Sequence, residues 1–168
     1  MYKFFYSKGF TFVEIFISLF VVGLISTLII PRYLDSKSML ALKTQSEELS
    51  EYFFLTQHTA ASLGLTLNVT INSSEDNSNF INSFSFFLPH IHTSIIQEDI
   101  IKFSNFVTCS LSTPITSIEF YPDKSWGLFI NSTSISASSF HILVSFKSTD
   151  YIIQFFPNSS SIQLIKPG

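Results

Sequence analysis

One apolar stretch near the N-terminus constrains this 168-residue chain more than any other feature. From Phe10 to Ile30 there are 21 residues, and Glu14 is the only charged one. As a helix rising about 1.5 Å per residue, the stretch is about 31 Å long, which matches the hydrocarbon core of a bilayer. A charged side chain inside such a span is costly, so Glu14 is a candidate functional residue that needs a partner.

Three interpretations of this stretch compete. A cleavable secretory signal needs an apolar core of about 7–15 residues and a small-residue cleavage site. Lys3 and Lys8 supply its basic start, but the apolar run is too long and no such site follows. A plain signal anchor, which holds an unrelated domain at a membrane, explains neither Glu14 nor the position of Gly9. The third interpretation depends on the residues around that glycine.

Residues 8–14, Lys-Gly-Phe-Thr-Phe-Val-Glu, resemble the prepilin peptidase recognition site of type IV pilins and pseudopilins. In that family a short basic leader ends in Gly, and the next residue is usually Phe. Thr or a similar residue follows, and Glu is the fifth residue of the processed chain. The resemblance covers residues 8–31, and Phe12 and Val13 are conservative departures from the commoner Leu and Ile.

The resemblance implies roles for individual residues. Prepilin peptidase would cut between Gly9 and Phe10, and the new amine of Phe10 would be N-methylated. Thr11, Glu14 and Pro31 stand where the family carries such residues and would serve in assembly. The implied partners are prepilin peptidase, other pilin or pseudopilin subunits and the bacterial inner membrane.

The chemistry of Glu14 can also be argued from the residues themselves. Cleavage after Gly9 would free an α-amine on Phe10, and Glu14 follows one helical turn later. Pairing the amine with the carboxylate, within one chain or between staggered neighbours, relieves two costly charges and penalises misregister in a low dielectric. The alternative is that Glu14 reaches the headgroups or is protonated.

The distribution of charged residues predicts how the chain is oriented in the membrane. Two lysines and no acid precede the apolar stretch, whereas seven basic and eleven acidic residues follow Pro31, a net charge of −4. Positive-inside reasoning puts the leader in the cytoplasm and the C-terminal domain in the periplasm or outside the cell, with a single membrane crossing. Cys109 is the only cysteine, so we expect no intramolecular disulfide and a small buried side chain.

Residues 32–64 are expected to continue the helix as an amphipathic segment. Five apolar residues mark one helical face: Leu42, Leu49, Phe53, Ala60 and Leu63. Three glutamates, Glu47, Glu48 and Glu51, lie largely off that face. Gly64 is a natural C-cap. Because proline is tolerated in membrane spans, we expect one helix from Phe10 to about Leu63, with two helices hinged at Pro31 as the alternative.

From Leu65 the hydrophobic period changes to two, which predicts an antiparallel β domain of about seven or eight strands. The expected strands are 65–71, 80–88, 95–103, 115–121, 126–131, 141–147, 151–156 and 159–165. The polar stretch 72–79 is expected to form a loop. One face of the sheet would cover the amphipathic helix.

A helix followed by an all-β region also matches the pilin plan, so the expected fold class is α+β. Four segments follow: a leader (1–9), a transmembrane and assembly helix (10–31), its amphipathic continuation (32–64) and a β-rich domain (65–168). Residues 118–123 and 155–159 also resemble parts of the H-type minor pseudopilins of type II secretion and the FimT-type minor pilins. The chain lacks the two C-terminal cysteines of many major pilins and the acidic calcium loop of major pseudopilins. Both absences favour a minor subunit.

Catalysis finds little support. His90 and His92 form the only tight histidine pair, and no cysteine or carboxylate cluster lies nearby in sequence to complete a metal site. The adjacent acids Glu75-Asp76 and Glu98-Asp99 are not spaced as a general acid and base. There is no nucleophile elbow and no phosphate loop. We therefore expect no enzyme, no catalytic residue, and no metal, cofactor or small-molecule substrate.

The sequence predicts a minor pseudopilin of a type II secretion pseudopilus, acting in protein export. A minor pilin of a type IV pilus or a DNA-uptake system is the first alternative, and a membrane-anchored β domain that never polymerises is the second. No nucleic-acid binding is expected, because the domain is acidic and its tail from Gln163 to Gly168 offers a single lysine. Its phenylalanines alternate as core-facing residues do, so we expect them to be buried rather than available for base stacking.

Overall fold

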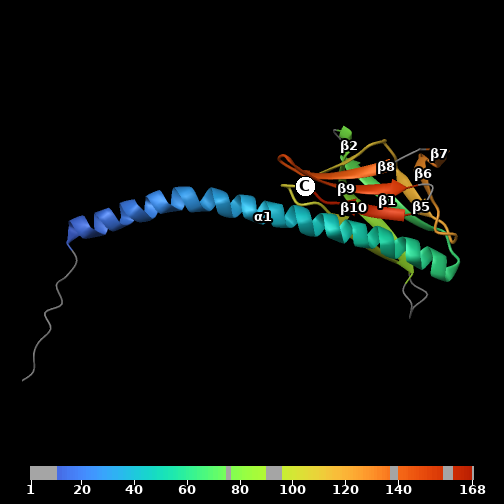
Figure 1. Ribbon diagram of the computed structural model, residues 1–168, viewed down its shortest axis with the longest axis horizontal. Coiled ribbons are helices and arrows are strands. Elements are labelled where there is room, and N and C mark those ends of the chain that lie inside the picture. Colours follow the sequence, from blue (N-terminus) through green and yellow to red (C-terminus); the bar gives the residue numbers. More distant parts are fainter. Residues whose placement is uncertain (1–10, 75–76, 90–95, 137–139, 157–160, 168) are drawn as a thin grey trace, which may run out of the picture. The chain divides into compact units, whose positions relative to one another are not determined.

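The computed structural model describes residues 11–74, 77–89, 96–136, 140–156 and 161–167 (Figure 1). It contains two compact units, the first ending at Lys37 and the second beginning at Ser38. The described elements are α1 (Phe12–Leu63), β1 (Leu67–Ser74), β2 (Asn77–Pro89), β3 (Ile96–Lys102), β4 (Thr108–Leu111), β5 (Ser117–Phe120), β6 (Trp126–Ile130), β7 (Thr133–Ile135), β8 (Phe140–Phe146), β9 (Thr149–Phe156) and β10 (Ser161–Ile165).

The helix α1 continues through Pro31 as one element, rather than dividing into two helices there. It ends at Leu63 because Gly64 adopts the left-handed conformation, with a φ of +68°. The N–H of Leu65 then donates to the carbonyl of Ala60 at 3.2 Å, which closes a Schellman motif. The prediction that Gly64 caps this helix is confirmed.

The face of α1 that packs on the sheet is wider than its apolar residues indicate. Leu42, Leu49, Phe53 and Ala60 are fully buried, whereas Leu63, the last residue of the helix, is 47% exposed. Four polar residues are buried on the same helix: Ser38, Ser46, Thr56 and Gln57. The hydroxyls of Ser46 and Thr56 donate to helix carbonyls four residues earlier, so their burial leaves no unpaired donor.

The ten strands form one curled antiparallel sheet in the order β10-β9-β8-β4-β2-β1-β5-β6-β7, and β3 pairs with β2. β8, β9 and β10 lie side by side (Figure 1). The two halves of the sheet join through a single pair, Phe80 of β2 with Ser110 of β4. The sheet curls far enough that Trp126 of β6 contacts Phe155 of β9, with their ring centroids 5.5 Å apart.

Two expectations about the strands are wrong. Residues 72–79 are not all loop, because β1 and β2 extend through this stretch and pair as far as Ser74 and Asn77. Cross-strand pairing outweighs the polar composition there. The sheet also has ten described strands rather than seven or eight, since β4 and β7 were missed. They have four and three residues, too few to establish a period of two.

Phe53 occupies the centre of the core between α1 and the sheet. Its ring centroid lies within 5.2 to 6.2 Å of four other phenylalanine rings, three of them in edge-on contact. Those rings come from β2, β5 and β9, and all of them are fully buried: Phe84, Phe86, Phe120 and Phe155. One helix residue therefore joins three strands that are far apart in sequence.

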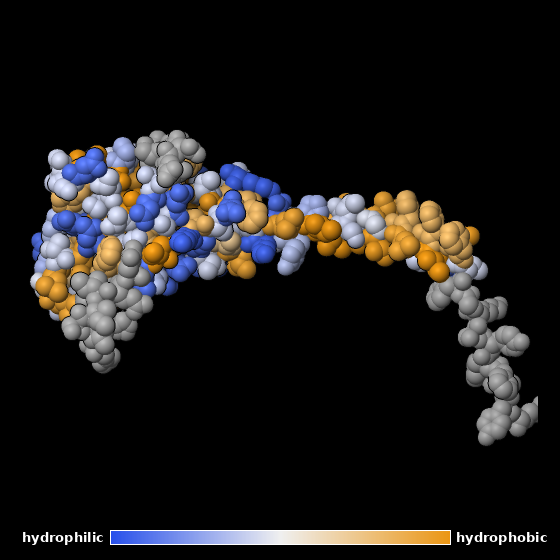
Figure 2. Space-filling model, turned by 180° about the vertical axis from the view of Figure 1, so that it is seen from behind, coloured by the Kyte–Doolittle hydropathy of each residue, from blue (hydrophilic) through white to orange (hydrophobic). Residues whose placement is uncertain are grey.

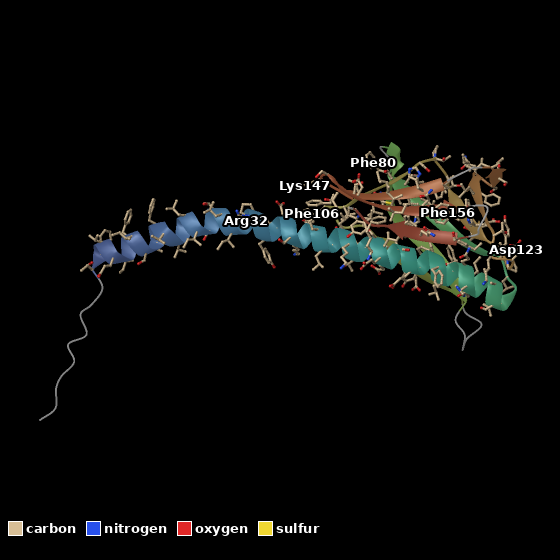
Figure 3. The ribbon with its side chains drawn as sticks, in the orientation of Figure 1. Arg32, Phe80, Phe106, Asp123, Lys147 and Phe156 are labelled. Atoms are coloured by element: carbon tan, nitrogen blue, oxygen red, sulfur yellow. The ribbon has the colours of Figure 1, made fainter. Side chains whose placement is uncertain are left out.

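Two glutamines of α1 fix the sheet by hydrogen bonds to its backbone. The side-chain amide of Gln45 donates to the carbonyl of Lys102 at the end of β3, at 3.3 Å. The amide of Gln57 donates to the carbonyl of Lys124 at 2.6 Å, in the turn that joins β5 to β6. Asp123 of the same turn lies near the end of α1 (Figure 3). Both contacts join polar side chains to the backbone, and such contacts cannot be predicted from the period of hydrophobic residues in the sequence.

Candidate membrane and assembly segment at the start of α1

Thr11 and Glu14 form a reciprocal cap at the first turn of α1. The Glu14 carboxylate oxygen Oε2 accepts the backbone N–H of Thr11 at 2.8 Å and the Thr11 hydroxyl at 2.9 Å. The backbone N–H of Glu14 donates to Thr11 Oγ1 at 3.3 Å, and the Thr11 carbonyl accepts the N–H of Ile15. This is a capping box, in which Thr11 is the N-cap and Glu14 the third helical residue.

The capping box gives Glu14 a role that the sequence analysis missed. A threonine followed three residues later by a glutamate, just before an apolar run, is its sequence signature. The cap satisfies donors at the helix start and places the carboxylate near the positive end of the helix dipole. In the uncleaved chain, therefore, Glu14 is held by hydrogen bonds from Thr11.

The helix that follows presents apolar side chains on all sides. Every large apolar side chain from Phe12 to Ile30 is exposed, up to 83% for Phe12. Figure 2 shows the hydrophobic colour gathered along this part of α1. By length and composition the helix can cross a membrane. A helix that is apolar all round needs lipid or neighbouring helices to cover it.

The hydroxyl groups within the apolar segment are all paired inside the helix. Ser18 donates to the carbonyl of Glu14, Ser26 to that of Val22, and Thr27 to that of Leu24, each at 2.7 Å. Hydroxyls paired in this way can enter hydrocarbon at low cost. The carboxylate of Glu14 is consequently the one charged group from Thr11 to Ile30, all of which are described.

Pro31 lies inside α1, seventeen residues after Glu14. Because proline has no N–H, the carbonyl of Thr27, four residues earlier, loses its usual helical partner. The structure thus places Thr11 and Glu14 together and leaves Pro31 at the far end of the apolar segment. Gly9 and Phe10 lie outside the described residues, so their predicted cleavage and N-methylation stay predictions.

The residues considered for catalysis do not form a site in the part of the chain that the structure describes. No group of three or more histidine, cysteine or acidic residues there could hold a metal. His90, His92, Glu75 and Asp76 lie outside the described residues. Cys109 is buried, and burial raises the pKa of its thiol, so it is an inert core residue rather than a nucleophile.

Similar solved structures identify the fold. Two crystal structures of the type IV minor pilin FimU of Pseudomonas aeruginosa match with TM-scores of 0.51 and 0.52, at 12% and 13% sequence identity. They cover 73% and 74% of this chain and 91% and 87% of FimU. The minor pseudopilin EpsH from the Type 2 Secretion System of Vibrio cholerae has a TM-score of 0.49 and 10% identity, covering 75% of this chain and 97% of EpsH.

No protein-family model matches the sequence, and no curated protein is significantly similar to it. At such low identities the similarity to solved structures establishes the fold. The chain has a pilin-like α+β fold, in which a long N-terminal helix packs on a curled antiparallel sheet. The predicted fold class is confirmed.

Proposed function

We propose that this chain is a minor subunit of a type IV pilin-like filament, anchored in the bacterial inner membrane and processed by prepilin peptidase after Gly9. Two observations together support the proposal, the fold and the segment at the start of the helix. The fold is pilin-like, and its helix begins at Phe12, three residues after Gly9, with an exposed apolar segment that holds one carboxylate. The proposed role is structural rather than enzymatic, and the proposed partners are prepilin peptidase and other pilin-like subunits.

Cleavage would change the surroundings of Glu14. In the full chain its carboxylate accepts two hydrogen bonds from Thr11. A free amine on Phe10 would add a cation one residue before that cap. The carboxylate could then pair with an amine, of its own chain or of a neighbour, at a depth in the membrane where unpaired charges are costly. Assembly would therefore be favoured after processing and in one register.

The proposal predicts that Gly9→Leu blocks removal of the leader. A leucine side chain should hinder close approach of the peptidase to the backbone, whereas the apolar segment and the domain are unchanged. Mass spectrometry of the protein from cells with active prepilin peptidase should show Met1 in the variant and Phe10 as the first residue of the wild type. A wild-type chain that keeps its leader in such cells would favour a non-polymerising membrane-anchored domain.

Of the filaments that such a subunit could join, we infer a secretion pseudopilus rather than a DNA-uptake pilus. Four of the five lysines of the second unit lie on separate elements: Lys43 on α1, Lys102 at the end of β3, Lys124 in the turn before β6 and Lys147 between β8 and β9. The lysine of the C-terminal tail, Lys166, is paired with Glu47 at 3.0 Å. The hydrogen bond from the Lys166 ammonium stabilises the carboxylate and so lowers the pKa of Glu47. Scattered and paired cations are a poor surface for phosphates.

The expectation that the phenylalanines are buried holds for only part of them. The core contains six fully buried ones, but Phe54, Phe80, Phe87 and Phe106 are between 37% and 58% exposed. The argument against nucleic acid therefore depends on charge rather than on a lack of exposed aromatic rings. Stacking on a single strand works together with a positively charged groove that follows the backbone.

A mobility-shift titration tests the choice between export and DNA uptake. The soluble fragment from about residue 34 onward should show no salt-sensitive DNA binding at physiological salt, because its six basic and eleven acidic residues give a net charge of −5, which repels the phosphates. Micromolar binding that weakens as salt rises would instead favour the DNA-uptake system. Neither outcome would change the proposed processing after Gly9.

A further inference from the structure

Three of the described asparagines stand in the pattern Asn-X-Ser/Thr: Asn68, Asn72 and Asn131. This pattern is the acceptor sequence for N-linked glycans, and a true acceptor lies in a surface loop of a secreted protein. A fourth match, at Asn158, lies outside the described residues. The pattern alone does not distinguish the three described matches, but their places in the fold do.

Asn68 and Asn72 lie on β1, in the interior of the sheet. β1 is paired with β2 on one side and with β5 on the other. The side-chain amide of Asn72 donates to the hydroxyls of Ser83 and Ser85, each at 3.2 Å. A transferase could take up either segment only if β1 left the sheet, which would break its pairing with both neighbours. These two matches are therefore poor acceptors.

Asn131 lies instead in the turn between β6 and β7. Ile130 pairs with Thr133, and the two residues between them form the turn. Asn131 and Ser132 both have a positive φ, +46° and +69°, as a type I′ hairpin turn requires. The backbone N–H of Asn131 donates to the Thr116 hydroxyl at 3.0 Å. All three residues of the pattern are exposed, so the turn presents the asparagine and the threonine together at the surface.

The hairpin that carries Asn131 opens at little cost. β7 has three residues at one end of the strand order, and three described pairs join it to β6. Short, exposed pairings of this kind open locally at a small fraction of the free energy of global unfolding. A transferase can therefore draw the turn into its own site while the core stays folded.

We propose that Asn131 is an acceptor for an N-linked glycan and that Thr133 is the hydroxyl residue that the transferase recognises. The donor class is an oligosaccharide joined through a pyrophosphate to a membrane lipid. The amide nitrogen of Asn131 attacks C1 of the first sugar, and a C–N bond forms. The bond from C1 to the pyrophosphate oxygen breaks, the lipid pyrophosphate leaves, and one amide proton passes to a base of the transferase.

The inference rests on the proposed function, which places this domain beyond the inner membrane, where secreted chains are modified. Trypsin separates the matches, because it cuts after lysine and arginine. Asn131 falls in the peptide 125–147, whereas Asn68 and Asn72 share the peptide 44–102. In protein purified from the membranes of the cells that make it, mass spectrometry should show 125–147 shifted upward by a whole number of sugar residues. The peptide 44–102 should have its unmodified mass.

Three variants show which atom carries the added mass. Asn131→Gln should remove the shift, because glutamine is not an acceptor. Thr133→Ala should also remove it although the asparagine is intact, whereas Thr133→Ser keeps the hydroxyl and should keep the shift. A shift that persists in Asn131→Gln would place the sugar on a serine or threonine hydroxyl and would overturn the proposal.

The same digest separates this inference from the proposed function. The peptide that ends at Arg32 begins at Phe10 in a processed chain and at Gly9 in an unprocessed one, since trypsin cuts after Lys8. An unmodified peptide 125–147 overturns the inference whichever residue comes first. If that result accompanies a start at Phe10, the inference fails and the proposed function stands.

Discussion

Replacing Phe53 by alanine is expected to lower the free energy of unfolding of the second unit by about 3–5 kcal/mol. Phe53 is fully buried and contacts four other buried phenylalanine rings. Its removal would leave a cavity between α1 and strands from three parts of the sheet. The four rings cannot all move into this cavity, because they are held by three separate strands. Denaturant unfolding of the full chain in detergent, followed by circular dichroism of the β signal, measures the loss.

The next residue along the helix supplies a matched control. Phe54 carries the same side chain but is 55% exposed, and its ring lies against His58 on the same helix, with the centroids 4.5 Å apart. Phe54→Ala should therefore cost about 0.5 kcal/mol or less, as surface substitutions usually do. Equal losses for the two variants would show that Phe53 is not the centre of the core.

Removing the charge of Glu14 is expected to prevent incorporation into filaments while the amount of protein in the membrane stays normal. Glu14→Ala removes both the charge and the cap of Thr11, so it does not separate the two roles. Glu14→Gln keeps an oxygen that can accept the N–H of Thr11, and glutamine also serves in a capping box. If the charge pairs with the amine of Phe10, the glutamine variant should lose about tenfold or more of its incorporation, as the alanine variant does.

Quantifying the subunit in sheared filaments and in membranes distinguishes the explanations. Incorporation of Glu14→Gln at the wild-type level, with loss only for Glu14→Ala, would assign Glu14 to capping alone. Full incorporation of both variants would show that Glu14 has no role in assembly. Disappearance of the variants from the membrane would point to an effect on insertion rather than on assembly.

Regular patterns in the sequence predicted much of the fold. The apolar face of α1 and the cap at Gly64 follow from a helical period and a glycine, and four of the five predicted face residues are buried. The buried polar residues of that face could not be predicted, because their burial depends on partners. Ser46 and Thr56 donate to helix carbonyls, and Gln57 reaches a turn 67 residues away.

Two sequence motifs overlap at the start of α1. Its residues are the ones the resemblance selects for cleavage and assembly, yet Thr11 and Glu14 also form a capping box that the sequence signature could have identified. The edge strand β7 had no comparable signal, because a strand of three residues is too short to establish a period of two.

The most direct test of the filament-subunit proposal is the intact mass of this protein recovered from sheared filaments. We predict a chain that begins at Phe10, carries one methyl group on its amine and lacks residues 1–9. A single mass reports processing, modification and assembly together, because unprocessed chains should remain in the membrane fraction. Recovery of the protein only from membranes, with Met1 and the whole leader still attached in cells that process other prepilins, would contradict the proposal.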